Sequence, residues 1–155
     1  MLNIYSKKTI KLSKQNIQDI FKLKNTHWKY SISEQKKFFQ TFIKKRDIHN
    51  LMYFKNELIG YTLLRNSKLV INKKKYDYFH FDTLIIKKKF RKLKLSNLQM
   101  DLNNSVIKLH KKPSVLFCND NMVRFYKKKN WTVINKNLSL PYLRGKMKKT
   151  LIFNF

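Results

Sequence analysis

The stretch Tyr76–His110 reads YDYFHFDTLIIKKKFRKLKLSNLQMDLNNSVIKLH, and its pattern changes twice. Its first part, Tyr76–Ile86, is rich in aromatic and β-branched residues, which favour a buried strand. A strongly basic run, Lys87–Lys92, follows. From Lys94 onward, apolar residues recur every three or four positions, which is typical of a long amphipathic helix. The stretch therefore predicts a strand, a tight basic loop and a helix at the centre of the fold.

Upstream of this stretch the sequence predicts one strand, two helices and a hairpin. Ser13 is placed to cap the first helix, and Ser31 with Glu34 forms a capping box before the second. The polar turn Lys55–Glu57 joins two apolar strands, as in an antiparallel hairpin. The predicted upstream elements are a strand at Tyr5–Leu12, helices at about Lys14–Lys24 and after Ser31, strands at Leu51–Phe54 and Leu58–Leu64, and a polar loop at Asn66–Lys75.

Downstream, Pro113 ends the long helix, and shorter segments complete the chain. Asn119 or Asp120 is placed to cap the next helix. The predicted downstream elements are a strand at Ser114–Cys118, a helix at about Asn121–Lys129, a strand at Trp131–Ile134, a loop at Asn135–Lys148 and a strand at Thr150–Phe155. With no internal repeat and no linker, this order predicts one mixed α/β domain over residues 1–155.

The composition excludes several classes of protein. Hydrophobic residues make up 43% of the 155 residues, enough for a full core, so the chain is not simply a disordered basic tail. No apolar run approaches the roughly 18 residues of a membrane span, and no apolar segment follows Met1–Tyr5 as in a secretory signal. The single cysteine, Cys118, leaves no internal disulfide, so a reducing cytoplasm is the expected location.

The net charge of +28, from 36 Lys and Arg against 8 Asp and Glu, has two interpretations. One is compositional, because Lys, Asn, Ile, Phe and Tyr are the residues that A/T-rich codons supply, and the lysines then form a solvated surface. The other is a surface that attracts nucleic acid, anionic lipid or anionic cofactors. In both cases the field favours anionic ligands and repels polycations.

The central strand, loop and helix also contain candidate chemical groups. Free amides at the start of a helix next to a basic loop make an anion site, although a solvated charge run has the same pattern. Strand alternation places His80 and Asp82 on one face. Asp82 is the one carboxylate well inside a predicted core strand, where it is either a base or a structural partner of a lysine. The one cysteine and four histidines have no metal-site spacing, so no metal is predicted.

Two stretches together resemble the GNAT superfamily of acetyl-CoA-dependent N-acetyltransferases. Arg91–Ser96 occupies the position of the family's phosphate loop, within Phe90–Met100, which has the family's rhythm of aromatic, Arg and apolar residues. Lys94 and Asn130 stand where the family has Gly. The second stretch is similar to the family signature in which an Asn precedes a Phe-Tyr pair and then an aromatic residue, and it contains Asn121, Phe125, Tyr126 and Trp131.

The resemblance covers most of the chain and implies a mixed, mostly antiparallel sheet that splays at its middle strand, with about four helices. It implies that acetyl-CoA lies along that strand and that the amides of the basic loop bind its pyrophosphate. Asn121 fits either a pantetheine contact or a helix cap. The residues that the resemblance assigns to acetyl-CoA are Leu84, Ile85, Ile86, Arg91, Lys92, Leu93, Lys94, Leu95, Ser96 and Asn121.

The resemblance also implies catalytic roles. Tyr126 corresponds to the general acid that protonates the leaving thiolate, or else it is an aromatic core residue. Asp82 is then the base, directly or through water, and His80 either supports it or is a core histidine. His27 and Trp28 lie in a loop that usually covers the acceptor site, or else they are packing and surface residues.

The implied function is transfer of an acetyl group from acetyl-CoA to a primary amine, such as that of an amino sugar. An anionic or zwitterionic amine suits the basic surface better than a polycationic aminoglycoside. Two alternatives stay open: a basic nucleic-acid-binding module on a degenerate transferase fold, with Lys73–Tyr76 contacting phosphates and bases, and an enzyme that acetylates a protein or ribosomal N-terminus. The oligomeric state is open, with a homodimer as one option.

Overall fold

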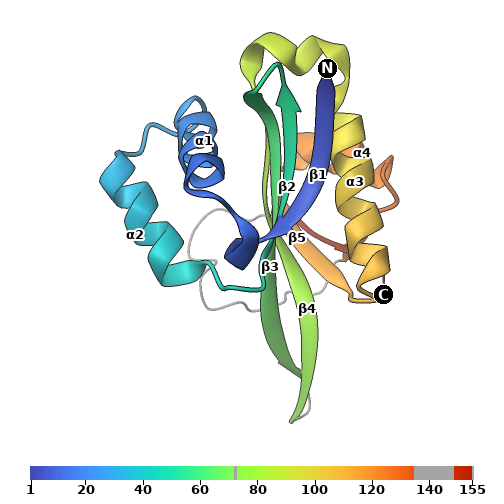
Figure 1. The fold of residues 1–155 in the computed structure, drawn as a ribbon. Coiled ribbons are helices and arrows are strands. Elements are labelled where there is room, and N and C mark those ends of the chain that lie inside the picture. Colours follow the sequence, from blue (N-terminus) through green and yellow to red (C-terminus); the bar gives the residue numbers. More distant parts are fainter. Residues whose placement is uncertain (72, 135–148, 155) are drawn as a thin grey trace.

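The computed structural model describes residues 1–71, 73–134 and 149–154, and it contains one twisted sheet with helices on both faces (Figure 1). The strands are β1 (Leu2–Lys8), β2 (Ile48–Phe54), β3 (Glu57–Ile71), β4 (Lys74–Ile86), β5 (Ser114–Cys118), β6 (Thr132–Ile134) and β7 (Lys149–Phe153). The helices are α1 (Lys14–Asn25), α2 (Ile32–Phe42), α3 (Leu95–Leu109) and α4 (Asp120–Lys127), with short 3-10 segments η1 (Thr9–Lys11) and η2 (Lys88–Leu93).

The sheet has the order β1-β2-β3-β4-β5-β7-β6. Among the strand pairs that the structure describes, β4 and β5 alone run parallel, and the other five pairs are antiparallel. The predicted mixed, mostly antiparallel sheet with four α-helices is therefore confirmed.

The two faces of the sheet carry separate cores. Helices α1 and α2 lie on one side, and α3 and α4 lie on the other (Figure 1). Phe21 of α1 belongs to the same buried cluster as Leu63 of β3. Met100 of α3 belongs to the second cluster, with Leu64 of β3. Leu63 and Leu64 thus face opposite sides, as strand alternation requires.

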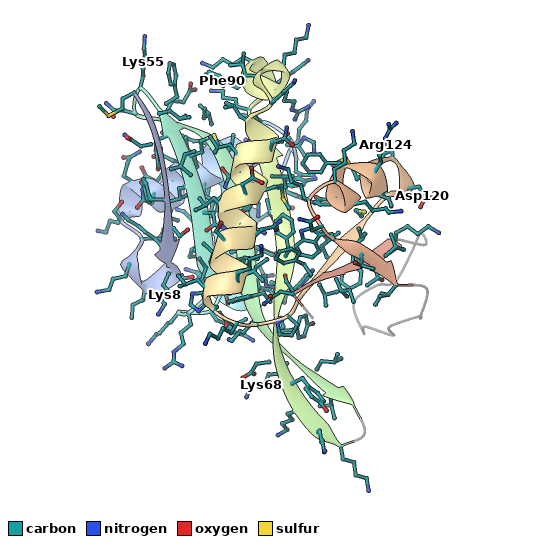
Figure 2. The ribbon with its side chains drawn as sticks, turned by 90° about the vertical axis from the view of Figure 1, so that its right-hand side faces the viewer. Lys8, Lys55, Lys68, Phe90, Asp120 and Arg124 are labelled. Atoms are coloured by element: carbon teal, nitrogen blue, oxygen red, sulfur yellow. The ribbon has the colours of Figure 1, made fainter. Side chains whose placement is uncertain are left out.

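A close approach fixes α3, which runs along the sheet in Figure 2, at Gly60 of β3. A Cβ atom on Gly60 would lie 3.0 Å from Oε1 of Gln99, so a larger residue would crowd the Gln99 side chain of α3. Gln99 also donates through Nε2 to the Asn50 carbonyl at 3.0 Å. Asn50 in turn donates through Nδ2 to Oδ1 of Asn103 at 3.1 Å. These buried bonds hold the N-terminus of α3 in register with the sheet.

The two predicted helix caps are confirmed. The Ser13 hydroxyl accepts from the Asn16 amide at 3.1 Å, and the Ser31 hydroxyl accepts from the Glu34 amide at 3.1 Å. The Glu34 carboxylate returns the bond by accepting from the Ser31 amide at 2.7 Å. Both caps satisfy amides that a helix leaves without partners. They set where α1 and α2 begin, and therefore where the loop between them lies.

The prediction of a loop at Asn66–Lys75 is wrong. β3 and β4 stay paired through this region, from Asn66 opposite Phe79 to Ile71 opposite Lys74, and they extend as an arm beyond the body of the fold (Figures 1 and 2). Residues on both faces of this arm are exposed, so no apolar face marks it as a strand in the sequence. The first strand also differs from its prediction at Tyr5–Leu12, because β1 lies at Leu2–Lys8.

The predicted loop at Asn135–Lys148 and the last residue of the predicted terminal strand, Phe155, lie outside the described residues. None of the helices in the described ranges has the length and apolar character that crossing a membrane would require.

His49 in β2 generates a pH dependence of stability. It is fully buried, and its ring nitrogens lie 2.8 Å from the Tyr61 hydroxyl and 2.9 Å from the Thr9 hydroxyl. Burial, with a smaller effect from the charge of Lys24, lowers the pKa of His49 to about 3. In the unfolded chain a histidine has a pKa of about 6.5, so between these values the unfolded state binds the extra proton. This contribution to stability is complete above pH about 6.5 and is lost as the pH falls toward 3.

We expect His49→Gln to flatten the acid side of the stability profile. Between pH 6 and pH 5 the native protein should lose about 1 kcal/mol more of its free energy of unfolding than the variant, because His49 contributes up to about 1.4 kcal/mol per pH unit. Urea unfolding at the two pH values measures both losses, and carboxylate effects cancel in the comparison. Equal losses in the two proteins would contradict the assignment to His49.

Candidate active site

The two central strands pair only briefly and then separate. β4 pairs with β5 over three positions, from Phe79 opposite Ser114 to Phe81 opposite Leu116. Beyond Phe81 the other edge of β4 stays paired with β3, as far as Ile86 opposite Gly60. Alternate N–H and C=O groups on the β5 side of this segment therefore have no strand partner within the described sheet. The predicted splay at the middle strand is confirmed.

A β-bulge lies where the strands separate. Leu63 pairs with Thr83 but Leu64 pairs with Phe81, so Asp82 is an extra residue in β4. Phe81 packs in the α3–α4 core, whereas Ile85 packs in the α1–α2 core, although the two are an even number of residues apart. The bulge therefore switches the face of every later side chain in β4. As a result Asp82 and Thr83, although consecutive, both line one pocket on the α1–α2 side.

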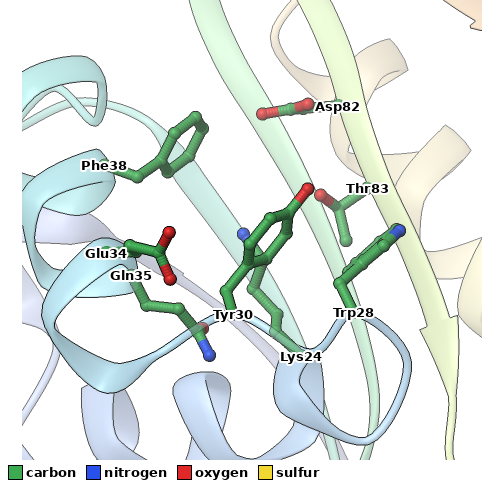
Figure 3. Close-up of a pocket in the computed structure, with 8 residues that line it drawn as sticks. All are labelled: Lys24, Trp28, Tyr30, Glu34, Gln35, Phe38, Asp82 and Thr83. Carbon is green, nitrogen blue, oxygen red and sulfur yellow. The ribbon is translucent and has the colours of Figure 1, made fainter.

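This pocket has a volume of about 400 Å³ and is formed by four elements (Figure 3). The end of α1, the α1–α2 loop and the first turns of α2 form one wall, and the bulge of β4 forms the other. Trp28, a predicted substrate residue, lines the pocket. His27 does not: it is exposed, its ring lies 4.6 Å from that of Trp28, and its Nδ1 is 3.3 Å from Arg91. The lining residues are Lys24, Trp28, Tyr30, Glu34, Gln35, Phe38, Asp82 and Thr83.

The charges around Asp82 come from two neighbouring strands. Oδ2 of Asp82 lies 3.5 Å from Nη1 of Arg65 in β3, and both side chains are about one-fifth exposed. The Arg65 guanidinium lies over the Phe38 ring at 6.0 Å. The other oxygen of Asp82, Oδ1, has no protein partner in the part of the chain that the structure describes. Asp82 is thus held on one side and open on the other.

His80 lies on the same face of β4 as Asp82, because Phe79 and Phe81 beside it point into the opposite core. Its ring is 5.6 Å from that of Phe117 in β5, and it does not line the pocket. Burial lowers the pKa of His80, although the charge of Asp82 acts in the opposite direction. His80 is therefore neutral near pH 7, and it packs toward β5 rather than into the pocket.

Tyr126 lies on the other side of the separating strands. It is 8% exposed, and its ring is 6.1 Å from that of Phe81, the last residue of β4 that pairs with β5. Burial raises the pKa of Tyr126 well above its ordinary value of 10, so the phenol stays protonated at physiological pH. Its hydroxyl makes no hydrogen bond within the described residues. Asn130 has φ of 64°, the left-handed backbone expected where the family has Gly.

The basic loop after β4 turns into α3 through Lys94. Lys94 has φ of 56° and ψ of 19°, and no side chain caps the helix that starts after it. The residues from Arg91 to Lys94 are exposed, and Leu95 and Ser96 are half-buried. Arg91 folds back, because its Nε donates to the Ile86 carbonyl at 3.0 Å. Exposed cations beside uncapped helix amides fit a pyrophosphate.

The residues at the end of β5 and the start of α4 have defined places in the structure. Asn119 occupies the N-cap position, as one of the two predicted caps, while Asn121 is exposed in the first turn and is not the cap. Cys118 is buried, and burial raises the pKa of its thiol, which agrees with packing rather than a nucleophilic role. No group of three metal-binding side chains is found in the described ranges.

Several pocket residues were missed from the sequence, and one left a signal. Lys24 lies four residues after Ile20 and three after Phe21, so it continues the buried face of α1. A lysine on an otherwise apolar face could have been singled out. Arg65 could not, because its approach to Asp82 depends on the register of β3 and on the bulge in β4.

Comparisons with known proteins place this architecture. No family model matches the sequence, and no curated protein matches it by sequence. Escherichia coli ElaA has a TM-score of 0.73 at 15% identity, over 98% of this chain and 99% of that chain. The Thermoplasma acidophilum PaiA N-acetyltransferase, solved with coenzyme A, has a TM-score of 0.63 at 14% identity, over 99% of both chains. Bacillus subtilis YlbP, an N-acetyltransferase also solved with coenzyme A, has a TM-score of 0.62 at 13% identity, over 99% and 96%. The chain therefore has the fold of the GNAT acetyltransferases, as its motifs suggested.

Proposed function

We propose that this chain is an N-acetyltransferase that moves an acetyl group from acetyl-CoA to a primary amine of a small molecule. The observation that carries the proposal is the separation of β4 from β5 just beyond Phe81. Within the described sheet it leaves strand backbone without a strand partner, with Tyr126 packed on one side and the Asp82 pocket on the other. An acyl donor and an amine acceptor could meet across this strand.

The donor would be bound mainly by backbone groups. Leu84, Ile85 and Ile86 offer the unpaired edge of β4 to the pantetheine amides. The uncapped amides and the cations from Arg91 to Ser96 would hold the pyrophosphate. A backbone amide near Ile85 would polarise the thioester carbonyl. Asn121, exposed in the first turn of α4, is available for a further polar contact.

The acceptor amine would enter the pocket as an ammonium and must lose a proton before it can attack. Asp82 Oδ1 is open to take this proton, directly or through a water molecule, while Arg65 holds Oδ2. The positive charges of Lys24 and Arg65 also disfavour a bound ammonium and so favour the neutral, nucleophilic amine. His80, two residues before Asp82 on the same face of β4, would support Asp82 as a neutral neighbour.

Acetyl-CoA supplies an activated acyl group, and the remaining chemistry belongs to side chains of this protein. The amine nitrogen forms a bond to the carbonyl carbon, and the bond from that carbon to sulfur breaks. Asp82 holds the proton that the ammonium lost before the attack, and Tyr126 donates its hydroxyl proton to the sulfur. The nitrogen loses a second proton as the amide forms; this proton passes through water to the Tyr126 oxygen and restores the phenol, and Asp82 then releases its own proton to water. The raised pKa of Tyr126 keeps this proton in place until the thiolate forms.

We expect acetyl-CoA to raise the melting temperature of the protein, and Tyr126→Phe to lower kcat about 100-fold, the usual effect of losing a general acid. Because the pKa of Tyr126 is raised, the native rate should show no loss from Tyr126 up to about pH 10. A thermal shift assay measures the change in melting temperature. The rate of CoA thiol release, measured over this pH range, tests the fall in kcat and the pH profile.

Tyr76→Phe provides the matched control, since Tyr76 is 47% exposed on the arm far from the site. Its kcat should equal that of the native protein. Absence of any thermal shift with millimolar acetyl-CoA would overturn the proposed function itself.

The left-handed backbone of Lys94 allows a second prediction. A residue with a side chain costs about 1 kcal/mol in this conformation, a cost that glycine does not have. Lys94→Gly should therefore increase the free energy of unfolding by about 0.5–1 kcal/mol in urea titrations. Lys92→Gly is the control, because Lys92 does not have a positive φ, and it should destabilise the protein. A loss of stability in Lys94→Gly would show that the Lys94 side chain has a structural role.

The arm formed by β3 and β4 favours a second candidate function, binding of nucleic acid. Lys73, Lys74 and Lys75 are exposed at its tip, next to the exposed ring of Tyr76. Cations beside an aromatic ring suit a single strand, with lysines on phosphates and the ring stacked on a base.

Filter binding of single-stranded RNA across a salt series tests this candidate. Changing the three lysines to Gln should reduce the slope of log K against log salt by about 0.7 for each lost phosphate contact. Lys127→Gln with Lys128→Gln, at exposed positions where α4 ends, should leave the slope unchanged. No retention of RNA at moderate salt would remove the candidate.

A further inference from the structure

Lys24 is a cation inside the pocket that has no anionic partner among the described residues. It continues the buried face of α1, and its ammonium points into the space that Asp82 and Thr83 also face (Figure 3). Its Nζ lies 4.9 Å from the centre of the Phe38 ring. No carboxylate lies within 4.0 Å of it in the described part of the chain. The ammonium is thus half-buried and unpaired.

The two acidic residues that line the pocket are engaged elsewhere. Asp82 contacts Arg65 at 3.5 Å. Glu34 accepts from the amide of Ser31 at 2.7 Å and from its hydroxyl at 2.8 Å, as part of the helix cap. Neither carboxylate forms an ion pair with Lys24 within the described residues, although the negative charge of Asp82 acts on it from a distance. The chain leaves one positive charge in the pocket for a ligand to neutralise.

This arrangement has an energetic cost that a ligand can offset. Burial removes water from the ammonium and lowers the pKa of Lys24 by more than the negative charge of Asp82 raises it, so the charged form is disfavoured. An anion bound beside Nζ restores the lost interaction through charge-assisted hydrogen bonds. Gln35, in the wall of the pocket, is held to α1, because its Nε2 donates to the Phe21 carbonyl at 3.2 Å.

We propose that Lys24 binds an anionic group of the acceptor, so that the acceptor is a primary amine that also carries a carboxylate or a phosphate. This inference rests on the proposed function and specifies its substrate class. Trp28 and Phe38 offer ring surface for an apolar or aromatic body between the two charged ends. The amine then lies toward Asp82 and Thr83, and the anion lies toward Lys24.

A polycationic acceptor fits this pocket poorly. Lys24 brings a positive charge into the pocket, and Arg65 brings a second one to Asp82, the one carboxylate of the pocket lining that is not used in the helix cap. A second ammonium on the acceptor would meet Lys24 without a counter-ion. A zwitterion instead places each of its charges against an opposite one. The acceptor pocket therefore selects by charge as well as by size.

The test uses three probes with the full chain: benzylamine, para-(aminomethyl)benzoate and para-(aminomethyl)phenyl phosphate. Titration calorimetry measures their dissociation constants. The native protein should bind at least one anionic probe about tenfold or more tightly than benzylamine. The better of the two anionic probes shows whether the site prefers a carboxylate or a phosphate.

Variants assign the preference to Lys24. Lys24→Met should remove it, and Lys24→Arg should retain it, which also shows that the fold tolerates a change at this position. Lys22→Met is the matched control, since Lys22 lies on the same helix, is exposed and does not line this pocket. It should keep the full preference for the anionic probe.

The inference is overturned if the native protein binds benzylamine as tightly as both anionic probes, or if Lys24→Met keeps the preference. A thermal shift with acetyl-CoA, measured on the same samples, tests the proposed function separately. A shift without an anion preference would leave acetyl transfer standing and remove only the role of Lys24. An anion preference without a thermal shift would remove acetyl transfer and leave Lys24 as the binding site of an anion.

Discussion

The short parallel pairing of β4 with β5 is the constraint on which the site depends. Three paired positions hold the two strands together, and the bulge at Asp82 then turns β4 so that its later side chains exchange faces. One strand can therefore contribute Phe81 to the core under α3 and α4, and Thr83 to the pocket under α1 and α2. Without the extra residue, Asp82 and Thr83 would point to opposite sides of the sheet.

The few carboxylates explain more of how the fold and the site are held together than the large positive charge of the chain does. Asp47 is fully buried and accepts from the amides of Lys44 and Asn66, so it holds the chain before β2 against β3. Glu57 contacts Lys87 and Lys89 and ties the start of β3 to the basic loop. Each acts as a structural anchor. Asp82 differs because it combines one cationic partner with an open side and a pocket, which is the arrangement a proton acceptor needs.

The sequence predicted those parts of the fold that have one buried face or a local hydrogen-bond motif. The strand ending at Ile86, the helix after Lys94 and the serine caps belong to this group, because each leaves a periodic or capping pattern. The arm at Asn66–Lys75 failed because both of its faces are solvated. Its backbone bonds come from pairing, which side-chain polarity does not report.

The residues of the candidate site likewise fall into those that a local pattern predicts and those that only packing brings together. Residues assigned by motif, such as Tyr126, come to the separating strands because their positions follow from strand and helix order. Lys24 reaches the pocket, and Arg65 reaches Asp82, through packing between elements distant in sequence. Lys94 and Asn130 add a further lesson, since both have the left-handed backbone that glycine adopts most easily. The surrounding structure imposes this conformation whatever the side chain, and so the path of the backbone, more than the letters of the motif, specifies where an anionic donor could bind.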